Sequence, residues 1–375
     1  MTDVVIVGGG LAGGSAAAIL ARAGVRPLLL EREREPRDKI CGEFLSAEAQ
    51  AYLTAIGLDL GPLGGARIGA VRLISGRRSV VSPLPFTALG LTRRRLDEAV
   101  LGHAERSGAC VERSVAVRSI APGRLETSVG ELEASTTLLA SGKHDVRGAR
   151  RDVSGADQGM IGFKSYFRLS ETMRAALQGF VEIVVFDGGY AGLQLVEDGV
   201  ANLCLLVRRE RFDAAGRTWP LLLGRLLAEP HLQARLGDAV ELSARPLTIS
   251  DVPFGFVHRS GGGWPSLFRL GDQAAVIASF SGDGMSIALH SASLAARAVL
   301  EGADAGAYHA RLHADIARPV GLARWLQRRL EAWPGPQPAL FALGLFPPAL
   351  ARLAAWTRVP EPALRVGLAG CVTPS

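Results

Sequence analysis

"DVVIVGGGLAGGSAAAILARAGVRPLLLE", residues 3–31, is the stretch that decides the fold. Residues 3–7 form a continuous apolar run that stops at glycines, residues 11–24 form a segment of small residues, and residues 26–31 form a second apolar run. This order predicts strand, helix and strand, with both strands apolar enough to be buried in a parallel sheet. The expected fold class is therefore α/β with a Rossmann-like unit.

The turn before this helix, "GGGLAG", matches the pattern GxGxxG through Gly8, Gly10 and Gly13. The first glycine permits a tight turn, the second lets the backbone approach a pyrophosphate, and the third allows close packing of helix and strand. The helix N-terminus then faces the anion. Glu31 ends the second strand, where a carboxylate suits a ribose diol and repels a 2′-phosphate. The pattern predicts a dinucleotide site and leaves FAD and NAD both open.

A second cofactor-type segment, "RLGDQAAVIASFSGDGMSIALHSASLAA", occupies residues 269–296. A strand ends there at Asp272, whose carboxylate can accept hydrogen bonds from ribitol hydroxyls, and "SGDGM" opens a long helix whose first amides can face a flavin ring. Two such helix starts, far apart in the chain, favour a long ligand such as FAD. The alternative is that Asp272 only caps a helix.

The remaining patterns predict how the chain is divided. From residue 156 onward, long alternating runs separated by "DGG" and "EDG" turns predict a meandering antiparallel sheet. The end of the chain is expected to be largely helical. The prediction is a discontinuous FAD-binding domain, an inserted antiparallel-sheet substrate domain and a helical C-terminal cap, comprising residues 1–155 with 260–305, 156–259 and 306–375 respectively.

Charge and composition narrow the function classes. The net charge of +6 comes from arginines dispersed among acids, so nucleic-acid binding is not predicted. Four scattered cysteines give neither a disulfide framework nor metal-ligand spacing, and His309 and His313 are interpreted as an exposed helix face. Without a secretory pattern at residue 1, a cytoplasmic location is expected. The apolar residues 338–356 predict two short helices packed on the core, with peripheral membrane contact as the alternative.

In combination, these motifs resemble the FAD-dependent p-hydroxybenzoate hydroxylase superfamily and, within it, the geranylgeranyl reductase branch. The resemblance rests on the glycine motif with Glu31, "KICGEFLS", "LTRRRLDEAVLGHA", "LLASGKHDVRG" and "GDQAAVIASFSGDGM". It implies that Arg93 and Asp272 contact FAD and that the amides of Gly282–Gly284 approach the isoalloxazine ring. The predicted FAD-binding residues are Gly8, Gly10, Gly13, Glu31, Arg32, Lys39, Cys41, Gly42, Arg93, Gly142, Asp272, Gly282, Asp283, Gly284 and Met285.

Two departures from the family pattern bear on the reaction. The family's proline, seven residues after Asp272, is replaced by Ser279, which leaves the shape of that loop open. The Trp-rich WxWxIP segment of flavin-dependent halogenases is absent, and "GGYAGLQLVEDG" stands in its approximate place. Chlorination is therefore not predicted.

Three residues are candidates for catalysis. The resemblance implies that the "KICGE" loop lies by the flavin and substrate, so Cys41 is predicted to donate a proton, or else to shape the pocket. Lys164 lies on a predicted strand among aromatic residues and is expected to meet an anionic or carbonyl group of the substrate; the alternative is a solvent-facing lysine. Tyr190 falls where the branch keeps an aromatic residue near the substrate, with turn packing as the alternative. Lys143 is interpreted either as a residue beside the dinucleotide or as a surface residue.

The expected protein is an FAD-dependent oxidoreductase that acts on a lipophilic isoprenoid- or polyketide-like substrate. The "KICGE" loop favours reduction of an activated double bond. Because only one dinucleotide motif exists, NAD(P)H is expected to visit transiently as electron donor. One alternative is a flavin-dependent monooxygenase that uses NAD(P)H and oxygen; another is a flavin-binding carrier protein without a substrate of its own.

Overall fold

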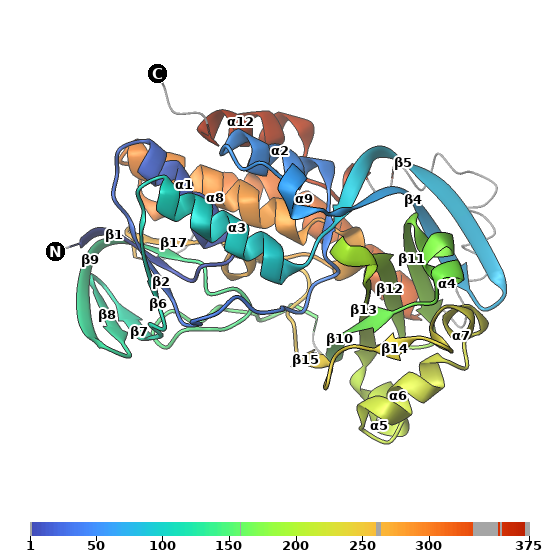
Figure 1. The fold of residues 1–375 in the computed structure, drawn as a ribbon. Helices are drawn as coiled ribbons and strands as arrows, with labels where there is room; N and C mark the ends of the chain where they lie inside the picture. The colour runs from blue at the N-terminus through green and yellow to red at the C-terminus, as the bar shows by residue number, and fades with distance from the viewer. Residues whose placement is uncertain (1, 158, 260–263, 333–351, 353–354, 372–375) are drawn as a thin grey trace.

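Two β-sheets carry the fold, and Figure 1 shows them next to each other, each with helices on one face. The computed structural model of the chain describes residues 2–157, 159–259, 264–332, 352 and 355–371. Its mixed architecture confirms the α/β class that the sequence predicts.

The first sheet is a parallel core with an antiparallel extension. Its strands are β1 (Thr2–Val7), β2 (Leu28–Glu31), β6 (Cys110–Arg113), β7 (Val117–Ala121), β8 (Arg124–Thr127), β9 (Gly130–Leu139) and β17 (Leu267–Arg269). They run in the order β6-β2-β1-β9-β8-β7, and β17 pairs with β9. The pairs formed by β1, β2, β6, β9 and β17 are parallel, whereas β7, β8 and β9 pair antiparallel. Apolar side chains on both faces of β1 bury this strand at the centre.

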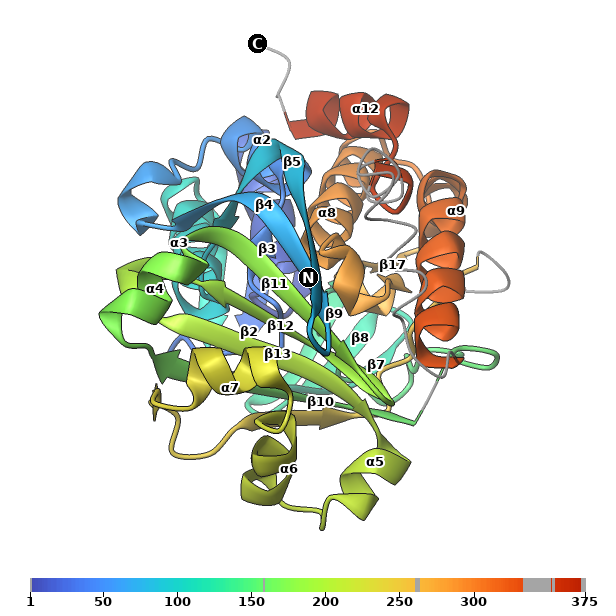
Figure 2. The same ribbon diagram turned by 90° about the vertical axis from the view of Figure 1, so that its right-hand side faces the viewer.

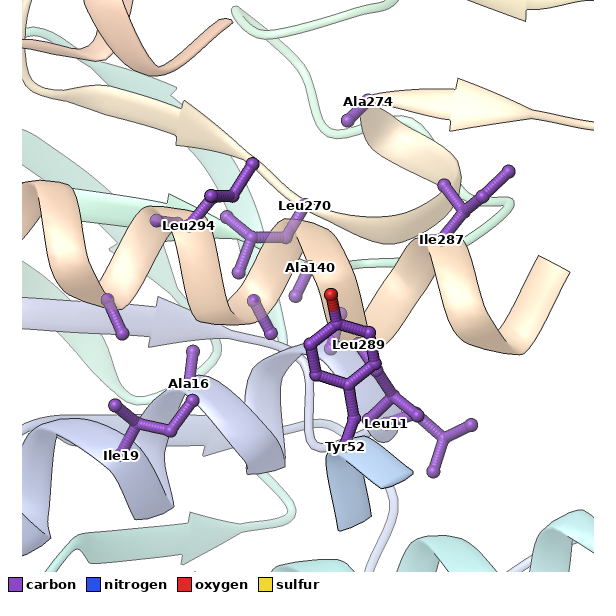
Figure 3. Packing of buried hydrophobic residues seen from close by; sticks show 14 of the residues in the cluster. Leu11, Ala16, Ile19, Tyr52, Ala140, Leu270, Ala274, Ile287, Leu289 and Leu294 are labelled. Carbon is purple, nitrogen blue, oxygen red and sulfur yellow. The ribbon is translucent and has the colours of Figure 1, made fainter. Parts of the chain in front are cut away.

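Three helices cover one face of this sheet: α1 (Leu11–Arg22), α3 (Arg93–Arg106) and α8 (Gly284–Leu300). Helix α1 packs against both others because its small residues permit close approach. A Cβ built on Gly14, for example, would lie 2.9 Å from a methyl carbon of Val100 on α3. Figure 3 shows part of the resulting core, in which Ala16 and Ile19 of α1 and Leu289 and Leu294 of α8 belong to one cluster of buried side chains.

The second sheet is largely antiparallel and has the order β14-β10-β13-β12-β11-β4-β5-β3, with β15 paired to β10. Its strands are β3 (Phe44–Leu45), β4 (Ala66–Ser75), β5 (Arg78–Gly90), β10 (Met160–Arg168), β11 (Gly179–Phe186), β12 (Gly189–Leu195), β13 (Ala201–Arg208), β14 (Val240–Glu241) and β15 (Leu247–Ser250). β4 and β11 form its parallel pair. Alternation along β10, β12 and β13 sends Phe163, Leu193 and Leu203 into a core on one face. Lys164, Gln194 and Asn202 therefore lie on the opposite face.

Four short helices lie with the second sheet: α4 (Glu171–Leu177), α5 (Arg209–Ala214), α6 (Trp219–Leu226) and α7 (Pro230–Leu236). Figure 2 shows α5, α6 and α7 on one side of this sheet. The opposite face meets residues 38–43 through hydrogen bonds from Lys164, Tyr166, Gln194 and Asn202. The predicted meander corresponds to β10–β13.

The chain crosses between the sheets more often than the sequence patterns indicate. Residues 44–45 and 66–90 lie within the predicted FAD-binding segment, yet they form β3, β4 and β5 of the second sheet. After the second sheet the chain returns to the first, since β17 pairs with β9 and leads to α8. A third small sheet pairs β16 (Phe256–Val257) with β18 (Ala275–Val276).

The C-terminal region contributes α9 (Ala305–Ala332) and α12 (Glu361–Cys371). Figure 1 shows α12 above α8 and beside α2 (Ala47–Ala55), and it packs against both. The apolar stretch 338–356 lies largely outside the described residues.

Candidate functional site

The carboxyl ends of four parallel strands meet at one edge of the first sheet. Gly8 follows β1, Glu31 ends β2, Gly142 comes shortly after β9, and Asp272 comes shortly after β17. Ligands of open parallel sheets bind in the crevice outside this edge. The fold thus brings together four predicted cofactor residues that are far apart in the sequence.

The glycine turn at this edge has no room for side chains. Gly8 has φ +104°, and a Cβ there would lie 2.5 Å from the carbonyl oxygen of Ala140. A Cβ on Gly13 would lie 1.9 Å from the Gly8 carbonyl oxygen. Gly10 differs, because its Cβ position faces the Lys39 ammonium at 3.4 Å and the Arg93 guanidinium at 3.7 Å. The turn therefore opens at Gly10 toward two cations, which fits a pyrophosphate.

Asp97 holds these two cations. Its carboxylate accepts bonds from Lys39 Nζ at 2.6 Å and from Arg93 Nε and Nη2 at 2.8 and 3.0 Å. Burial alone would raise the pKa of Asp97, but Arg93 and Lys39 lower it below its usual range. With Asp97 ionised, the group keeps one excess positive charge for an anionic ligand.

Glu31 borders this turn from the end of β2. Its carboxylate accepts bonds from the backbone N–H of Gly9 at 2.7 Å and of Glu33 at 2.9 Å. A small pocket beside it is lined by Gly9, Lys39 and Asp97, among others. Arg32, a predicted contact, is half-exposed and pairs with Glu33.

Asp272 lies in a tight turn after β17 and pairs with Lys143. The Lys143 ammonium is 3.2 Å from its carboxylate and 3.4 Å from the carbonyl oxygen of Ile40. Burial by itself would raise the pKa of Asp272, but Lys143 lowers it, so the carboxylate is ionised. Gln273 ties the same turn to the carbonyl oxygen of Gly142 at 2.8 Å.

The predicted flavin-facing residues 282–285 divide into two groups. Gly282, in the left-handed conformation with φ +70°, packs against the ring of Phe44. The side chains of Asp283 and Met285 are instead buried, and Asp283 accepts a bond from the backbone N–H of Val359 at 3.0 Å. Burial chiefly raises the pKa of Asp283 to about 7. Only the backbone of Asp283 and Met285 is therefore available as a ligand contact.

Cys41 lies partly buried in the segment between Lys39 and Glu43. The backbone N–H of Glu43 donates to Cys41 Sγ at 3.4 Å. The Arg93 guanidinium interacts with the same sulfur. Burial alone would lower the pKa of Arg93, but Asp97 and Cys41 raise it. The thiol and the cation group at Gly10 are therefore parts of one site.

Lys164 and Tyr190 both project from the second sheet toward this region. Lys164 is 1 % exposed and its ammonium is 2.5 Å from Glu43, so it is no solvent-facing lysine. The ring of Tyr190 stands edge-on to Phe280, with centroids 6.3 Å apart, and Phe280 precedes Gly282 by two residues. Tyr190 thus lies beside the turn where the sequence predicts the flavin ring.

The sequence motifs do not single out Asp97 or Glu43 as site residues, and they leave the place of Lys143 open. Asp97 follows Arg93 by four positions on a helix, a spacing that predicts a pair and could have revealed it. Glu43 stands within the quoted "KICGE" loop, but nothing local to the sequence shows which cation it meets. For Lys143 the sequence allows two interpretations, and in the structure its ammonium pairs with the carboxylate of Asp272.

Other sequence expectations turn out differently. The interpretation of His309 as exposed is wrong: it is 6 % exposed, and its Nε2 accepts a bond from the Arg269 backbone N–H at 3.1 Å. His313 on the same helix is half-buried. In the described part of the chain, no cluster of His, Cys, Asp and Glu suits a metal ion. Within the same part, each helix is too short or too polar to span a bilayer.

Comparison with known proteins supports the flavin interpretation. Residues 1–124 match the family described as FAD binding domain. The menaquinone reductase of Mycolicibacterium smegmatis is 26 % identical over 362 residues, which cover 86 % of this chain and 83 % of that protein. Its match therefore extends far beyond the FAD-binding segment.

Solved structures show the same fold along the chain. The flavin-dependent brominase Bmp2 superposes with a TM-score of 0.76 at 15 % identity, covering 98 % of this chain and 97 % of that one. A geranylgeranyl bacteriochlorophyll reductase-like protein from Thermoplasma acidophilum gives 0.73 at 16 % identity, covering 98 % and 95 %. At these identities, the likeness extends to the fold alone.

Proposed function

We propose that this chain, an FAD-dependent oxidoreductase of the p-hydroxybenzoate hydroxylase superfamily, reduces a carbon–carbon double bond in a lipophilic substrate that carries an isoprenoid chain, such as a menaquinone. The observation that carries this proposal is the likeness to a menaquinone reductase over 86 % of the chain. The "KICGE" loop, which lies beside the cation group at Gly10, supports it.

The residues at the sheet edge fit FAD. Gly8, Gly10 and Gly13 leave the backbone free to approach a pyrophosphate, and Lys39 with Arg93 supplies positive charge there. At a distance along the same edge, the ionised Asp272 can accept bonds from ribitol hydroxyls. Bound in its reduced form, FAD would supply the hydride.

Cys41 is proposed to supply the proton. Addition of hydride to one carbon of an activated double bond leaves an electron pair that the activating group stabilises, and a proton from Cys41 Sγ or from water at the other carbon completes the reduction. Solvent then returns a proton to the sulfur, which lies near the Arg93 guanidinium. NAD(P)H is the proposed source of the electrons, and Tyr190 with Phe280 is proposed to contact the apolar substrate.

The test is turnover of the FAD-loaded protein with menaquinone and NADPH, with oxygen uptake and product mass both measured. The proposal expects turnover without oxygen, and a product that keeps two added hydrogen atoms after exposure to air. A quinol would lose them on reoxidation. Oxygen uptake in proportion to product, with an oxygen atom added to it, would instead establish the monooxygenase.

A further inference from the structure

The segment that carries Cys41 is fastened to the second sheet by side chains from three strands. Asn202 on β13 donates to the carbonyl oxygen of Gly42 at 3.0 Å, and Gln194 on β12 donates to that of Glu43 at 2.9 Å. Lys164 on β10 donates to the carbonyl oxygen of Lys39 at 3.0 Å. The sheet therefore fixes the backbone on both sides of Cys41.

Glu43 stands at the centre of this attachment. Its side chain is fully buried, and Oε1 accepts bonds from Lys164 Nζ at 2.5 Å, Tyr166 Oη at 2.8 Å and the backbone N–H of Arg93 at 2.8 Å. A carboxylate buried this way is costly unless it is paired and hydrogen-bonded. Here one oxygen atom joins β10 of the second sheet to the first residue of α3.

The backbone of Glu43 adopts a conformation that a side chain disfavours. Its φ is +60°, a region that glycine adopts freely and that costs a glutamate about 1–2 kcal/mol. Glycine or asparagine would suit the turn better, so the conformation alone does not explain a glutamate. The side chain makes three hydrogen bonds through Oε1, and these interactions oppose the strain.

Both reactive parts of the site depend on this residue. The Glu43 backbone N–H donates to Cys41 Sγ, and its carboxylate holds the helix start that bears Arg93. The ammonium of Lys164 already makes three contacts: with Glu43, with the Lys39 carbonyl oxygen and with the face of Tyr166 at 4.6 Å. The ammonium is thus directed at the loop and not at a substrate.

We propose that Glu43, ion-paired with Lys164, is the positioning residue that keeps the Cys41 segment and the start of α3 in a fixed relation, and that Lys164 acts through Glu43 instead of touching the substrate. This inference deepens the proposed function and rests on it for the identity of the reaction. The contacts of Glu43 and Lys164 that support it are all within this chain and do not depend on which reaction is catalysed.

The test measures the loop directly, by the rate at which iodoacetamide alkylates Cys41 in the FAD-loaded protein, read by peptide mass. Glu43→Gln leaves the Lys164 charge buried and uncompensated, so Cys41 alkylation and FAD release should both rise by about tenfold or more. Lys164→Met should give a similar rise. The double variant Glu43→Gln/Lys164→Met should return toward wild type, because it removes both charges.

Glu197 offers a matched control. It is also a buried carboxylate, in the turn between β12 and β13, and it accepts a bond from the backbone N–H of Thr92, the residue before Arg93, at 2.8 Å. Its hydrogen bonds and ion pair in the described part of the chain are with Thr92 and Arg95 and not with the Cys41 segment, so Glu197→Gln should leave Cys41 alkylation within about twofold of wild type. If Glu43→Gln does not fold, Tyr166→Phe removes one of the three bonds and should still raise alkylation measurably.

Three results would overturn the inference: an unchanged alkylation rate in Glu43→Gln, an equal rise in Glu197→Gln, or loss of turnover in Lys164→Met with alkylation and FAD release unchanged. The last would make Lys164 a catalytic residue. Alkylation and FAD release are measured without a substrate. A protein that fails to reduce menaquinone would therefore contradict the proposed function, and these two measurements would still test the role of Glu43.

Discussion

At the scale of single residues, the site is defined by a glycine turn that has no room for side chains and by two cations that can attract an anion. Gly8 and Gly13 keep side chains out of the turn, whereas Gly10 faces two cations. The glycine pattern and the acid at the end of β2 could be predicted from sequence, because their spacing is fixed by one strand-turn-helix unit. The partners of Glu43 could not, since Lys164 and Tyr166 are more than a hundred residues away and only the folded sheet brings them together.

Replacing Asp272 by alanine should cost the protein most of its yellow colour. The substitution removes the ionised acceptor proposed for FAD and leaves Lys143 without its carboxylate. The flavin content of the purified protein and its affinity for added FAD, expected to fall by about tenfold or more, measure the effect. Asp152→Ala, at an exposed position, is the control and should remain yellow. Full flavin content in Asp272→Ala would contradict the assignment.

Replacing Cys41 by serine tests the thiol. If Sγ donates the proton, Cys41→Ser should retain FAD while turnover falls by about a hundredfold, because a hydroxyl is a far weaker acid. The measurement is the rate of product formation at a fixed flavin content. Unaltered turnover would leave Cys41 as a packing residue and assign the proton to water.

At the scale of elements, buried polar groups connect the helices to the sheets. Glu182 on β11 accepts bonds from Arg72 on β4 and from His231 and Arg235 on α7. Amphipathic patterns predict that these elements have one buried face, but not that a carboxylate lies there. Such networks need groups from separate segments, so no local pattern reveals them.

Glu182→Gln should lower the free energy of unfolding by about 3–5 kcal/mol, because it leaves buried cations without their counter-charge. Burial alone would raise the pKa of Glu182, but bonds from His231 and Arg235 lower it to about 2. Its stabilisation is therefore present above the ordinary value of 4.5 and is lost as the pH falls from there through about 2. Denaturant titrations across that range measure it.

The control is Glu301→Gln, which removes an exposed partner of Arg297 on α8 and should change stability by less than about 1 kcal/mol. An equal loss in both variants would show that the Glu182 cluster contributes no more than a surface pair.

Asp283 should make the protein less stable as the pH rises. Burial chiefly raises its pKa from 3.8 to about 7, so the folded state holds a proton that the unfolded state releases. The contribution is complete below about 4 and is lost as the pH rises through about 7. Asp283→Asn keeps an acceptor for the Val359 N–H and removes the titration. The unfolding free energy of wild type relative to this variant should therefore decline over that interval; a flat difference would contradict the raised pKa.

At the scale of the whole molecule, comparison with known proteins confirmed the FAD-binding class. This class could be predicted from the sequence because one cofactor motif follows the first strand and another follows the last strand of the first sheet. The strand content of the second sheet could not be predicted, because β4 and β5 come from a part of the chain that lies between two FAD-binding motifs in the sequence. The docking of α12 likewise depends on contacts between distant segments. Gly367 on α12 lies so close to the buried pair Tyr52 and His290 that a Cβ there would be 2.0 Å from Tyr52 Oη.

Gly367→Ala should therefore lower the free energy of unfolding by about 1–3 kcal/mol, because α12 must shift away from α2 and α8. Gly321→Ala on α9 is the matched control: nothing lies within 4 Å of its Cβ position, and a helical alanine should stabilise the protein by up to about 1 kcal/mol. Thermal or denaturant unfolding compares the two. Equal effects would show that α12 is not held at this contact.

The central claim is that the bound flavin delivers its electrons to a double bond of a lipophilic substrate. Its most direct test is a single turnover without oxygen, in which protein carrying reduced FAD is mixed with menaquinone while the flavin colour is followed. The account predicts that the yellow colour returns at the rate at which a product with two added hydrogen atoms forms, and that this product survives exposure to air. A flavin that stays colourless until oxygen is admitted, with an oxygen atom then found in the product, would contradict it.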